Sequence, residues 1–270
     1  MIAEREVLPA AGAGGGSLPY TGERIVPGKT PEPVLREHET RYVFAGRRVR
    51  DLDILDLACG TGMGTHYLLR AGARSCLGLD IDAAAVAYAR AAYRDCRFEL
   101  GDAANLPLAN QSFDAVVSFE TIEHLRDQRK FLRECQRVLR PGGLLICSTP
   151  NRTMNGWKNR NPHHVREFTA AEFAGFLEDG FSQVALYAQN RESYWLRLAE
   201  TTIAGALQRF GMRSAVRRLL RGQAAAPPQR REFDERQCDV DGEIQPYVAA
   251  WHLQPRYLLG VARKAAPRSA

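Results

Sequence analysis

The chain has 270 residues, 45% of them hydrophobic and 25% charged, so it can bury a sizeable core and is neither a disordered nor a fibrous protein. No apolar run approaches the length of a membrane span, and Glu4, Arg5 and Glu6 stand where a secretory leader needs apolar residues, so we expect a cytoplasmic protein. The net charge is +6, and its excess is uneven: nine arginines accompany two acidic residues between Arg191 and Arg231. This excess indicates either an anionic partner or solvated arginine-rich helices.

The first fifty residues are interpreted as a tail followed by an arm. Residues 10–17 are alanine, glycine and serine only, which is typical of a flexible linker, so we expect 1–17 to be a disordered tail. A polar segment follows, and then an expected helix from about residue 32 to residue 49. We interpret 18–50 as an N-terminal arm and helix that cap the acceptor side of a pocket.

A glycine-rich turn follows the first apolar strand, which is expected over 53–58. Gly60 and Gly62 in this turn let the backbone pass close to a nucleotide-like ligand. Asp80 ends the next apolar run, about 20 residues further on, where a carboxylate can bind ribose hydroxyls. Asp102 follows a third apolar run, a position at which nicotinamide-binding domains do not need an acid.

The same turn argues against a dehydrogenase. A nicotinamide-binding domain carries a third glycine shortly after the first two. Thr65 and His66 occupy that region here. We therefore do not expect a nicotinamide-dependent dehydrogenase.

Strands and helices alternate through the middle of the chain. Strands are expected over 53–58, 76–80, 96–101, 113–119, 143–149 and 181–188, with a final strand over 257–262. The helices between them are expected over 63–71, 83–94, 127–139 and 170–177. This alternation implies a parallel sheet covered by helices on both faces. We assign 51–190 to the core domain, 191–250 to a basic helical lid insertion, and 251–270 to the final core strand and tail.

An E-x-x-E-H pattern follows the strand at 113–119. In a helix, Glu120, Glu123 and His124 would lie at positions i, i+3 and i+4 on one face. Two carboxylates and an imidazole could hold a divalent ion such as Mg²⁺ or Mn²⁺, which lowers the pKa of a bound acceptor hydroxyl. Without a metal, His124, with Glu123 beside it, could instead act as a general base or line the acceptor pocket.

The glycine turn, the two acids and the segments 113–120 and 140–146 together resemble the class I S-adenosylmethionine (SAM)-dependent methyltransferases, of the type 11/12 group. The resemblance implies an α/β, Rossmann-like, doubly wound sheet of seven mostly parallel strands with an antiparallel last strand. It also implies SAM as the cofactor. The cofactor-binding residues that it implies are Asp56, Gly60, Gly62, Asp80, Ile81, Asp102, Ala103 and Phe119.

The E-x-x-E-H pattern is similar to the metal site of ubiquinone-pathway O-methyltransferases and of small-RNA 3′-end 2′-O-methyltransferases. The latter add a histidine from a loop after a Thr-Pro-Asn strand end, and this chain has Thr-Pro-Asn at 149–151 and then His163 and His164. Either histidine could be the added ligand. The metal ligands that the resemblance implies are Glu120, Glu123, His124 and His164.

Two further segments, 21–27 and 37–42, resemble bacterial methyltransferases of glycan or secondary-metabolite pathways. The resemblance implies O-methylation of a sugar hydroxyl or of another small hydroxylated metabolite, with or without a phosphate group. RNA 2′-O-methylation is an alternative, although the sequence has no recognisable RNA-binding module. A non-catalytic SAM-binding scaffold or regulator is a second alternative.

Overall fold

The computed structural model describes residues 18–20, 22, 24–155, 161–193, 240–247 and 253–266. The expected tail, 1–17, and most of the expected lid, 194–239 and 248–250, lie outside the described residues. Within the described part of the chain, no helix is long and apolar enough to cross a bilayer.

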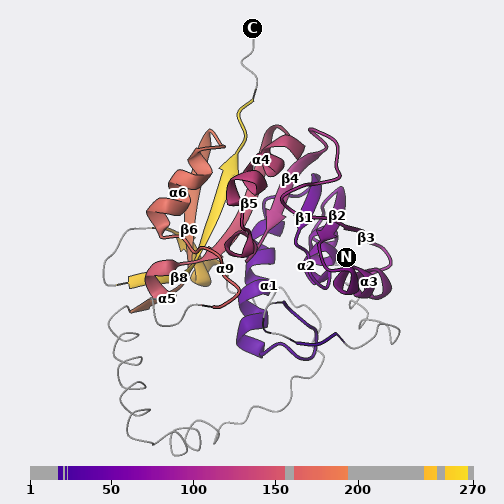
Figure 1. Cartoon of the computed structure of the whole chain (residues 1–270), viewed down its shortest axis with the longest axis horizontal. Coiled ribbons are helices and arrows are strands. Elements are labelled where there is room, and N and C mark those ends of the chain that lie inside the picture. Colours follow the sequence, from indigo (N-terminus) through magenta and orange to yellow (C-terminus); the bar gives the residue numbers. More distant parts are fainter. Residues whose placement is uncertain are drawn as a thin grey trace, which may run out of the picture.

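An eight-stranded sheet runs through the described molecule, with strand order β3-β2-β1-β4-β5-β8-β6-β7 (Figure 1). The strands are β1 (Asp53–Leu57), β2 (Ser75–Asp80), β3 (Arg97–Leu100), β4 (Phe113–Ser118), β5 (Leu139–Pro150), β6 (Gln183–Ser193), β7 (Ile244–Pro246) and β8 (Leu253–Arg263). Strands β1 to β5 pair in parallel, and β8 lies antiparallel between β5 and β6. The expected Rossmann-like sheet with an antiparallel last strand is confirmed.

The described sheet has one strand more than the expected seven. Strand β7 lies inside the segment 191–250, which we expected to be a helical insertion, yet it pairs antiparallel with Tyr187, Ala188 and Gln189 of β6. Its three residues are too few to show an alternating pattern, so only the pairing with β6 defines it as a strand. The short helix α9 (Val240–Glu243) precedes it.

Helices cover both faces of the sheet, as the alternation predicts. One face carries α1 (Glu32–Gly46), α2 (Met63–Arg70) and α3 (Ala83–Ala92), and the other carries α4 (Gln128–Val138) and α6 (Ala170–Glu178). Side chains of β1 divide between the two cores: Leu55 and Leu57 pack with α4 and α6, whereas Ile54 packs with α1 and α2. This division follows from the two-residue period of a strand.

Capping residues explain where two of the helices begin. Asp82 is the N-cap of α3 and accepts hydrogen bonds from the backbone nitrogens of Ala84 and Ala85 at 2.7 and 3.2 Å. Thr169 and Glu172 form a reciprocal capping box at the start of α6. Because an N-cap satisfies otherwise unpaired N–H groups, each fixes the position of its helix end. The cap at Asp82 fixes α3 next to the carboxyl end of β2.

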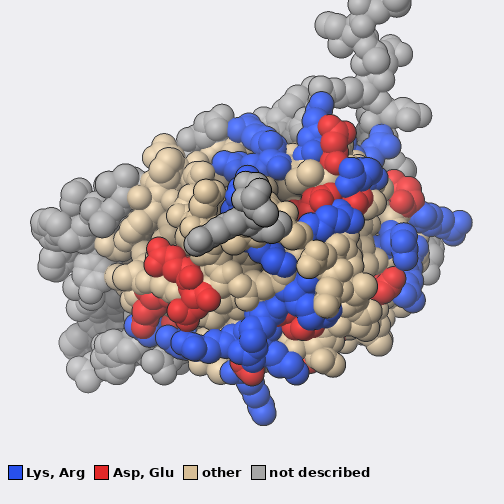
Figure 2. Space-filling model, turned by 90° about the horizontal axis from the view of Figure 1, so that it is seen from above, with Lys and Arg blue, Asp and Glu red and all other residues tan. Residues whose placement is uncertain are grey.

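Charged side chains of both signs share the described surface. On the face seen in Figure 2, Lys and Arg are interleaved with Asp and Glu. At the amino ends of the central strands, Arg74 and Arg140 each pair with both Asp53 and Asp114, at N–O distances of 2.7 to 3.0 Å. These hydrogen bonds to arginine lower the pKa of Asp53. The arginine-rich segment that suggested an anionic partner lies mostly outside the described residues.

Candidate active site

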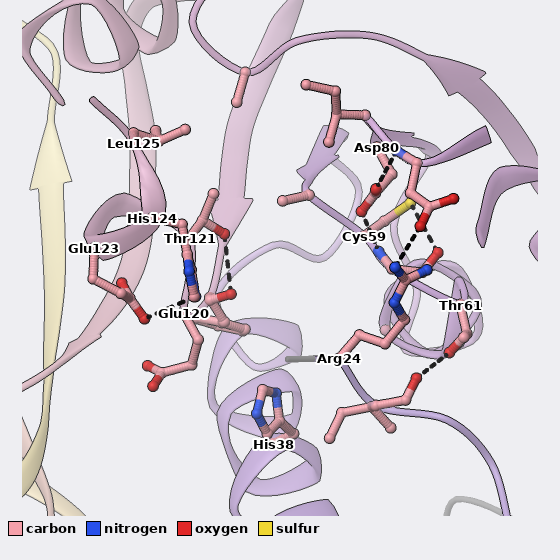
Figure 3. A pocket seen from close by; sticks show the side chains of 18 of the residues that line it. Arg24, His38, Cys59, Thr61, Asp80, Glu120, Thr121, Glu123, His124 and Leu125 are labelled. Carbon is pink, nitrogen blue, oxygen red and sulfur yellow. Dashed lines mark hydrogen bonds and ion pairs between the residues drawn. The ribbon is translucent and has the colours of Figure 1, made fainter. Parts of the chain in front are cut away.

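A cavity of about 620 Å³ lies at the carboxyl ends of the parallel strands, the edge at which α/β sheets bind ligands. Its wall combines the glycine turn with the N-terminal arm, α1, the end of β5 and the loop that contains His164. Figure 3 shows Cys59, Thr61 and Asp80 on one side and Glu120, Glu123 and His124 on the other, with His38 of α1 below the space between them. One cavity therefore joins the expected donor and acceptor sides.

Asp80 ties the glycine turn to the start of α3. Its Oδ2 accepts a hydrogen bond from Gly60 N at 2.8 Å, and its Oδ1 accepts one from Asp82 N at 2.9 Å. Each carboxylate oxygen retains a lone pair that can accept a further hydrogen bond. Six of the eight expected cofactor-binding residues line the cavity: Gly60, Asp80, Ile81, Asp102, Ala103 and Phe119. Ile81 has 72% of its surface exposed, as expected for an apolar side chain that a ligand can cover.

Asp56 and Gly62, the other two expected cofactor-binding residues, do not line the cavity. Asp56 is fully buried beneath the turn, where it accepts hydrogen bonds from Tyr42 Oη at 3.1 Å and Thr65 Oγ1 at 2.6 Å. Its side chain points toward α1 and α2 because of its register in β1. Gly62 has a φ of +82°, and a Cβ there would lie 2.7 Å from the ring of Phe98. Both residues therefore support the conformation of the turn on the side that faces away from the cavity.

Burial, with a smaller contribution from the charge of Asp80, raises the pKa of Asp56 to about 7, although hydrogen bonds from Thr65 and Tyr42 oppose the shift. The folded-state pKa thus lies above the unfolded value of about 4, so Asp56 favours folding fully below pH 4. That contribution is lost as the pH rises toward 7. We expect the free energy of unfolding of the wild type to fall relative to Asp56→Asn by up to about 1.4 kcal/mol per pH unit in this window. Urea denaturation of both proteins at pH 5, 6 and 7 measures this difference. A difference in the free energy of unfolding that stays constant over these pH values would contradict the prediction.

The N-terminal arm is bound to both parts of the donor side. Thr61 Oγ1 of the glycine turn donates a hydrogen bond to the backbone oxygen of Ile25 at 3.0 Å. Arg24 forms an ion pair with the carboxylate of Asp82 at the start of α3. Arg24 also lines the cavity, and our sequence analysis did not include it among the site residues. The only signal for it is the resemblance of the segment 21–27.

The E-x-x-E-H segment does not form an α-helix that would place Glu120, Glu123 and His124 on one face. Glu120 has a φ of +51°, in the left-handed region, and only Ile122–His124 form a short 3-10 helix. Glu120 N donates to Ser148 Oγ at 3.2 Å, and that hydroxyl donates back to Glu120 Oε1 at 2.6 Å. The same carboxylate lies 3.7 Å from Nη1 of the buried Arg41. Glu120 is thus held by β5 and α1, outside the cluster that the other expected ligands form.

Glu123, His124 and His164, three of the four expected metal ligands, form that cluster, with one ligand atom from each within 4.8 Å of the others. Glu123 Oε1 lies 4.0 Å from His124 Nε2. The side chain of His163 is exposed, whereas His164 lines the cavity. The structure therefore brings His164 to the site. It is held by Glu167, whose Oε1 lies 2.6 Å from His164 Nδ1.

Hydrogen bonding orients the imidazole of His124. Its Nδ1 lies 3.2 Å from the backbone oxygen of His163. A carbonyl oxygen only accepts, so Nδ1 carries the proton, and in the neutral ring the lone pair is on Nε2. This lone pair is on the side of Glu123. His124 can therefore accept a proton or bind a metal at Nε2.

The electrostatics of the acceptor side favour neutral groups. Burial and the negative charge of Glu120 raise the pKa of Glu123 well above its usual value. Thr149 Oγ1 donates to Glu123 Oε2 at 3.1 Å, but Glu123 Oε1 is buried without a hydrogen-bond partner among the described residues. Burial, with Arg41 nearby, lowers the pKa of His38 well below its usual value. His38 is therefore a neutral imidazole at the cavity wall.

Three acceptor-side residues were not among the individual site residues expected from the sequence. His38 of α1 and Arg256 and Tyr257 of β8 all line the cavity. Glu37 accepts hydrogen bonds from Tyr257 Oη at 2.9 Å and from Arg256 Nη1 at 3.1 Å. Pairing of β8 with β5 places these two residues beside Pro150, a contact that no local pattern indicates.

Residues 55–147 match the profile of the methyltransferase domain family. A probable SAM-dependent methyltransferase of Mycolicibacterium smegmatis is 45% identical over 166 residues, 60% of this chain and 64% of that protein. A ubiquinone biosynthesis O-methyltransferase of Dinoroseobacter shibae is 33% identical over 172 residues, 54% of this chain and 69% of that protein. A crystal structure of a SAM-dependent methyltransferase from Thermotoga maritima superposes with a TM-score of 0.55 at 16% identity, covering 85% of this chain and 92% of that one.

These matches, with the fold and the glycine turn, establish that the chain belongs to the class I SAM-dependent methyltransferases. SAM is the methyl donor of this family. The chain spans slightly under two thirds of the length of the mycobacterial relatives.

Proposed function

We propose that the chain transfers the methyl group of SAM to a hydroxyl oxygen of a small hydroxylated metabolite, and that this metabolite contains a sugar. The observation that carries the proposal is the single cavity: Asp80 and the glycine turn form one wall, and His124 with Glu123 forms the opposite wall. Methyl transfer is an in-line displacement that needs donor and acceptor about 3 Å apart in one dry space.

On the donor side, Asp80 would bind the ribose hydroxyls. Its two hydrogen bonds from backbone nitrogens fix the carboxylate before the ligand arrives, which reduces the entropy lost on binding. Ile81, Asp102 and Ala103 would surround the adenine. Gly60 has a φ of +56° and no atom within 4 Å of the point where a Cβ would lie, so it leaves room for the methionine part.

On the acceptor side, His124 would act as the general base. The acceptor hydroxyl loses its proton to Nε2 as its oxygen lone pair attacks the methyl carbon, and the sulfur leaves as a neutral thioether. Glu123 Oε1 lies 4.0 Å from Nε2, so the positive charge that forms on the imidazole would favour the ionised form of Glu123, and the two charges would then stabilise each other. Charge-assisted contacts of this kind are stronger in a buried site than in water.

A divalent ion fits the same residues. Glu123 Oε1 is buried without a hydrogen-bond partner in the described structure, and Glu123, His124 and His164 offer one carboxylate and two imidazoles. Asn161 Nδ2 lies 3.0 Å from His164 Nε2, so binding at that nitrogen requires the amide to turn away. A bound Mg²⁺ or Mn²⁺ would lower the pKa of the acceptor hydroxyl.

The polar acceptor wall supports a polyol-like substrate. His38, Glu120, Arg256 and Tyr257 all present hydrogen-bonding groups to the cavity. Groups of this kind select a ligand that uses their remaining hydrogen-bonding capacity, because an apolar ligand displaces water from them without replacing its hydrogen bonds. Two relatives are named as O-methyltransferases, of ubiquinone biosynthesis and of malonyl-acyl carrier protein, which supports an oxygen acceptor. The alternative of RNA methylation is supported by the arginine-rich segment. Among the described residues, nothing favours RNA over a small metabolite as the acceptor.

The full chain, incubated with isotopically labelled SAM and a panel of sugars, phenols, carboxylic acids and short RNAs, tests the proposal. We expect label on a sugar-containing hydroxyl compound, located by mass spectrometry. Label found only on RNA or only on a carboxylate would contradict the proposed class of acceptor. SAM binding without any transfer would favour the non-catalytic SAM-binding scaffold or regulator.

The metal is tested separately. We expect a strong chelator to abolish transfer and added Mg²⁺ or Mn²⁺ to restore it, because the ion would supply hydroxyl activation. SAM binding, measured in parallel by calorimetry, should not change. Full activity in the presence of chelator would contradict the proposed metal and leave His124 as the general base.

A further inference from the structure

A second group of metal-ligating side chains lies outside the cavity. His66 is on α2, and Asp95 and Cys96 are in the turn between α3 and β3. None of the three is among the described residues that line the cavity. These three residues, which we call the distal cluster, play no part in the proposed methyl transfer.

The three ligand atoms form a small triangle. His66 Nδ1 lies 3.3 Å from Asp95 Oδ1 and 3.7 Å from Cys96 Sγ, and Cys96 Sγ lies 3.8 Å from the same Oδ1. In a tetrahedral zinc site, bond lengths of about 2.0 Å to N or O and 2.3 Å to S place ligand atoms roughly 3.3 Å (N to O) and 3.5 Å (to S) apart. The triangle thus has nearly the dimensions of one face of a zinc tetrahedron.

The surroundings suit such an ion. The ring of His66 stacks on Tyr93, with centroids 4.8 Å apart and planes 23° apart, which fixes the direction of Nδ1. His66 is largely buried, whereas the side chain of Asp95 is 50% exposed, so the fourth position of a tetrahedron faces solvent. Nitrogen, oxygen and sulfur together favour Zn²⁺ or Co²⁺ over Mg²⁺ or Ca²⁺.

We propose that His66, Asp95 and Cys96 bind a zinc-class divalent ion, with water as the fourth ligand. The thiol of Cys96 gives its proton to solvent as the sulfur–metal bond forms, and no redox step is involved. The ion joins α2 to the turn that precedes β3. Phe98 of β3 packs against Gly62 at the start of α2, so the ion clamps the part of the fold that carries the glycine turn.

Cobalt substitution tests the site, because thiolate coordination to Co²⁺ gives a near-ultraviolet charge-transfer band that carboxylates and imidazoles do not give. We expect the full chain to develop this band, saturating at one ion per chain, and Zn²⁺ to abolish it. Cys96→Ser should remove the band, and His66→Asn should weaken cobalt binding at least about tenfold. Unchanged far-ultraviolet circular dichroism shows that each variant is folded.

Two controls separate the distal cluster from other ligands. His124→Ala removes a residue of the active-site cluster, and Cys238→Ser removes a thiol outside the described residues; both should retain the band. Zn²⁺ should also raise the Tm of the wild type more than that of Cys96→Ser. A band that survives Cys96→Ser, or no band in excess Co²⁺, would overturn the proposal, and neither result bears on methyl transfer.

Discussion

Replacing Asp80 by alanine should raise the Kd for SAM by about two to four orders of magnitude. Hydrogen bonds to a charged carboxylate contribute about 1.5–3 kcal/mol, and this variant loses the two that Asp80 would make with the ribose. It also releases Gly60 N and Asp82 N, so the turn loses its tie to α3. Isothermal titration calorimetry measures the effect.

Two further variants show whether the loss is specific to Asp80. Glu99→Ala removes a carboxylate from the neighbouring strand β3, outside the cavity wall, and should leave the Kd unchanged. Asp80→Asn keeps one acceptor oxygen and should fall between the wild type and alanine. Equal affinity of Asp80→Ala and the wild type would refute the assignment of the donor side.

Loss of the His124 imidazole should lower kcat by about two to four orders of magnitude, the usual contribution of a positioned general base. The Kd for SAM should not change in His124→Ala, since His124 is on the wall opposite Asp80 (Figure 3). Single-turnover transfer to the acceptor found in the panel, with SAM saturating, isolates the chemical step.

His163 provides the matched control for this experiment. Its side chain is exposed, and its backbone oxygen contacts His124. His163→Ala therefore keeps that contact, and its kcat should equal that of the wild type. A loss in His163→Ala as large as in His124→Ala would show that the loop, and not the imidazole, matters for transfer.

The donor side could be predicted well because its signals are local. The strand expected over 53–58 is found at Asp53–Leu57, and Asp82 caps α3 as its position indicates. Strand alternation, turn glycines and N-caps each depend on a few neighbouring residues, so the sequence alone contains them. Asp56 is the exception, because its burial depends on Tyr42 of α1.

The acceptor side could be predicted only in part because distant contacts shape it. Ser148 of β5 accepts a hydrogen bond from the backbone nitrogen of Glu120 and donates one to its carboxylate. The backbone of Glu120 is left-handed, so the E-x-x-E-H segment does not form an α-helix. Arg256 and Tyr257 reach the cavity through the pairing of β8 with β5. Neither contact leaves a periodic pattern in the sequence. The choice of His164 over His163 likewise depends on the fold of the loop.

Ala58 and Glu120 follow the two central strands, β1 and β4, and both have left-handed backbones, with φ of +61° and +51°. Each left-handed residue costs about 1–2 kcal/mol relative to glycine, so these two positions at the rim of the cavity store backbone strain. Glycine at position 58 would relieve that strain and make the protein more heat-resistant. Glycine at position 120 would also remove the carboxylate that binds Ser148 and lies 3.7 Å from the buried Arg41, which offsets the gain. The backbone strain at position 120 is therefore balanced by contacts of the carboxylate that glycine could not make.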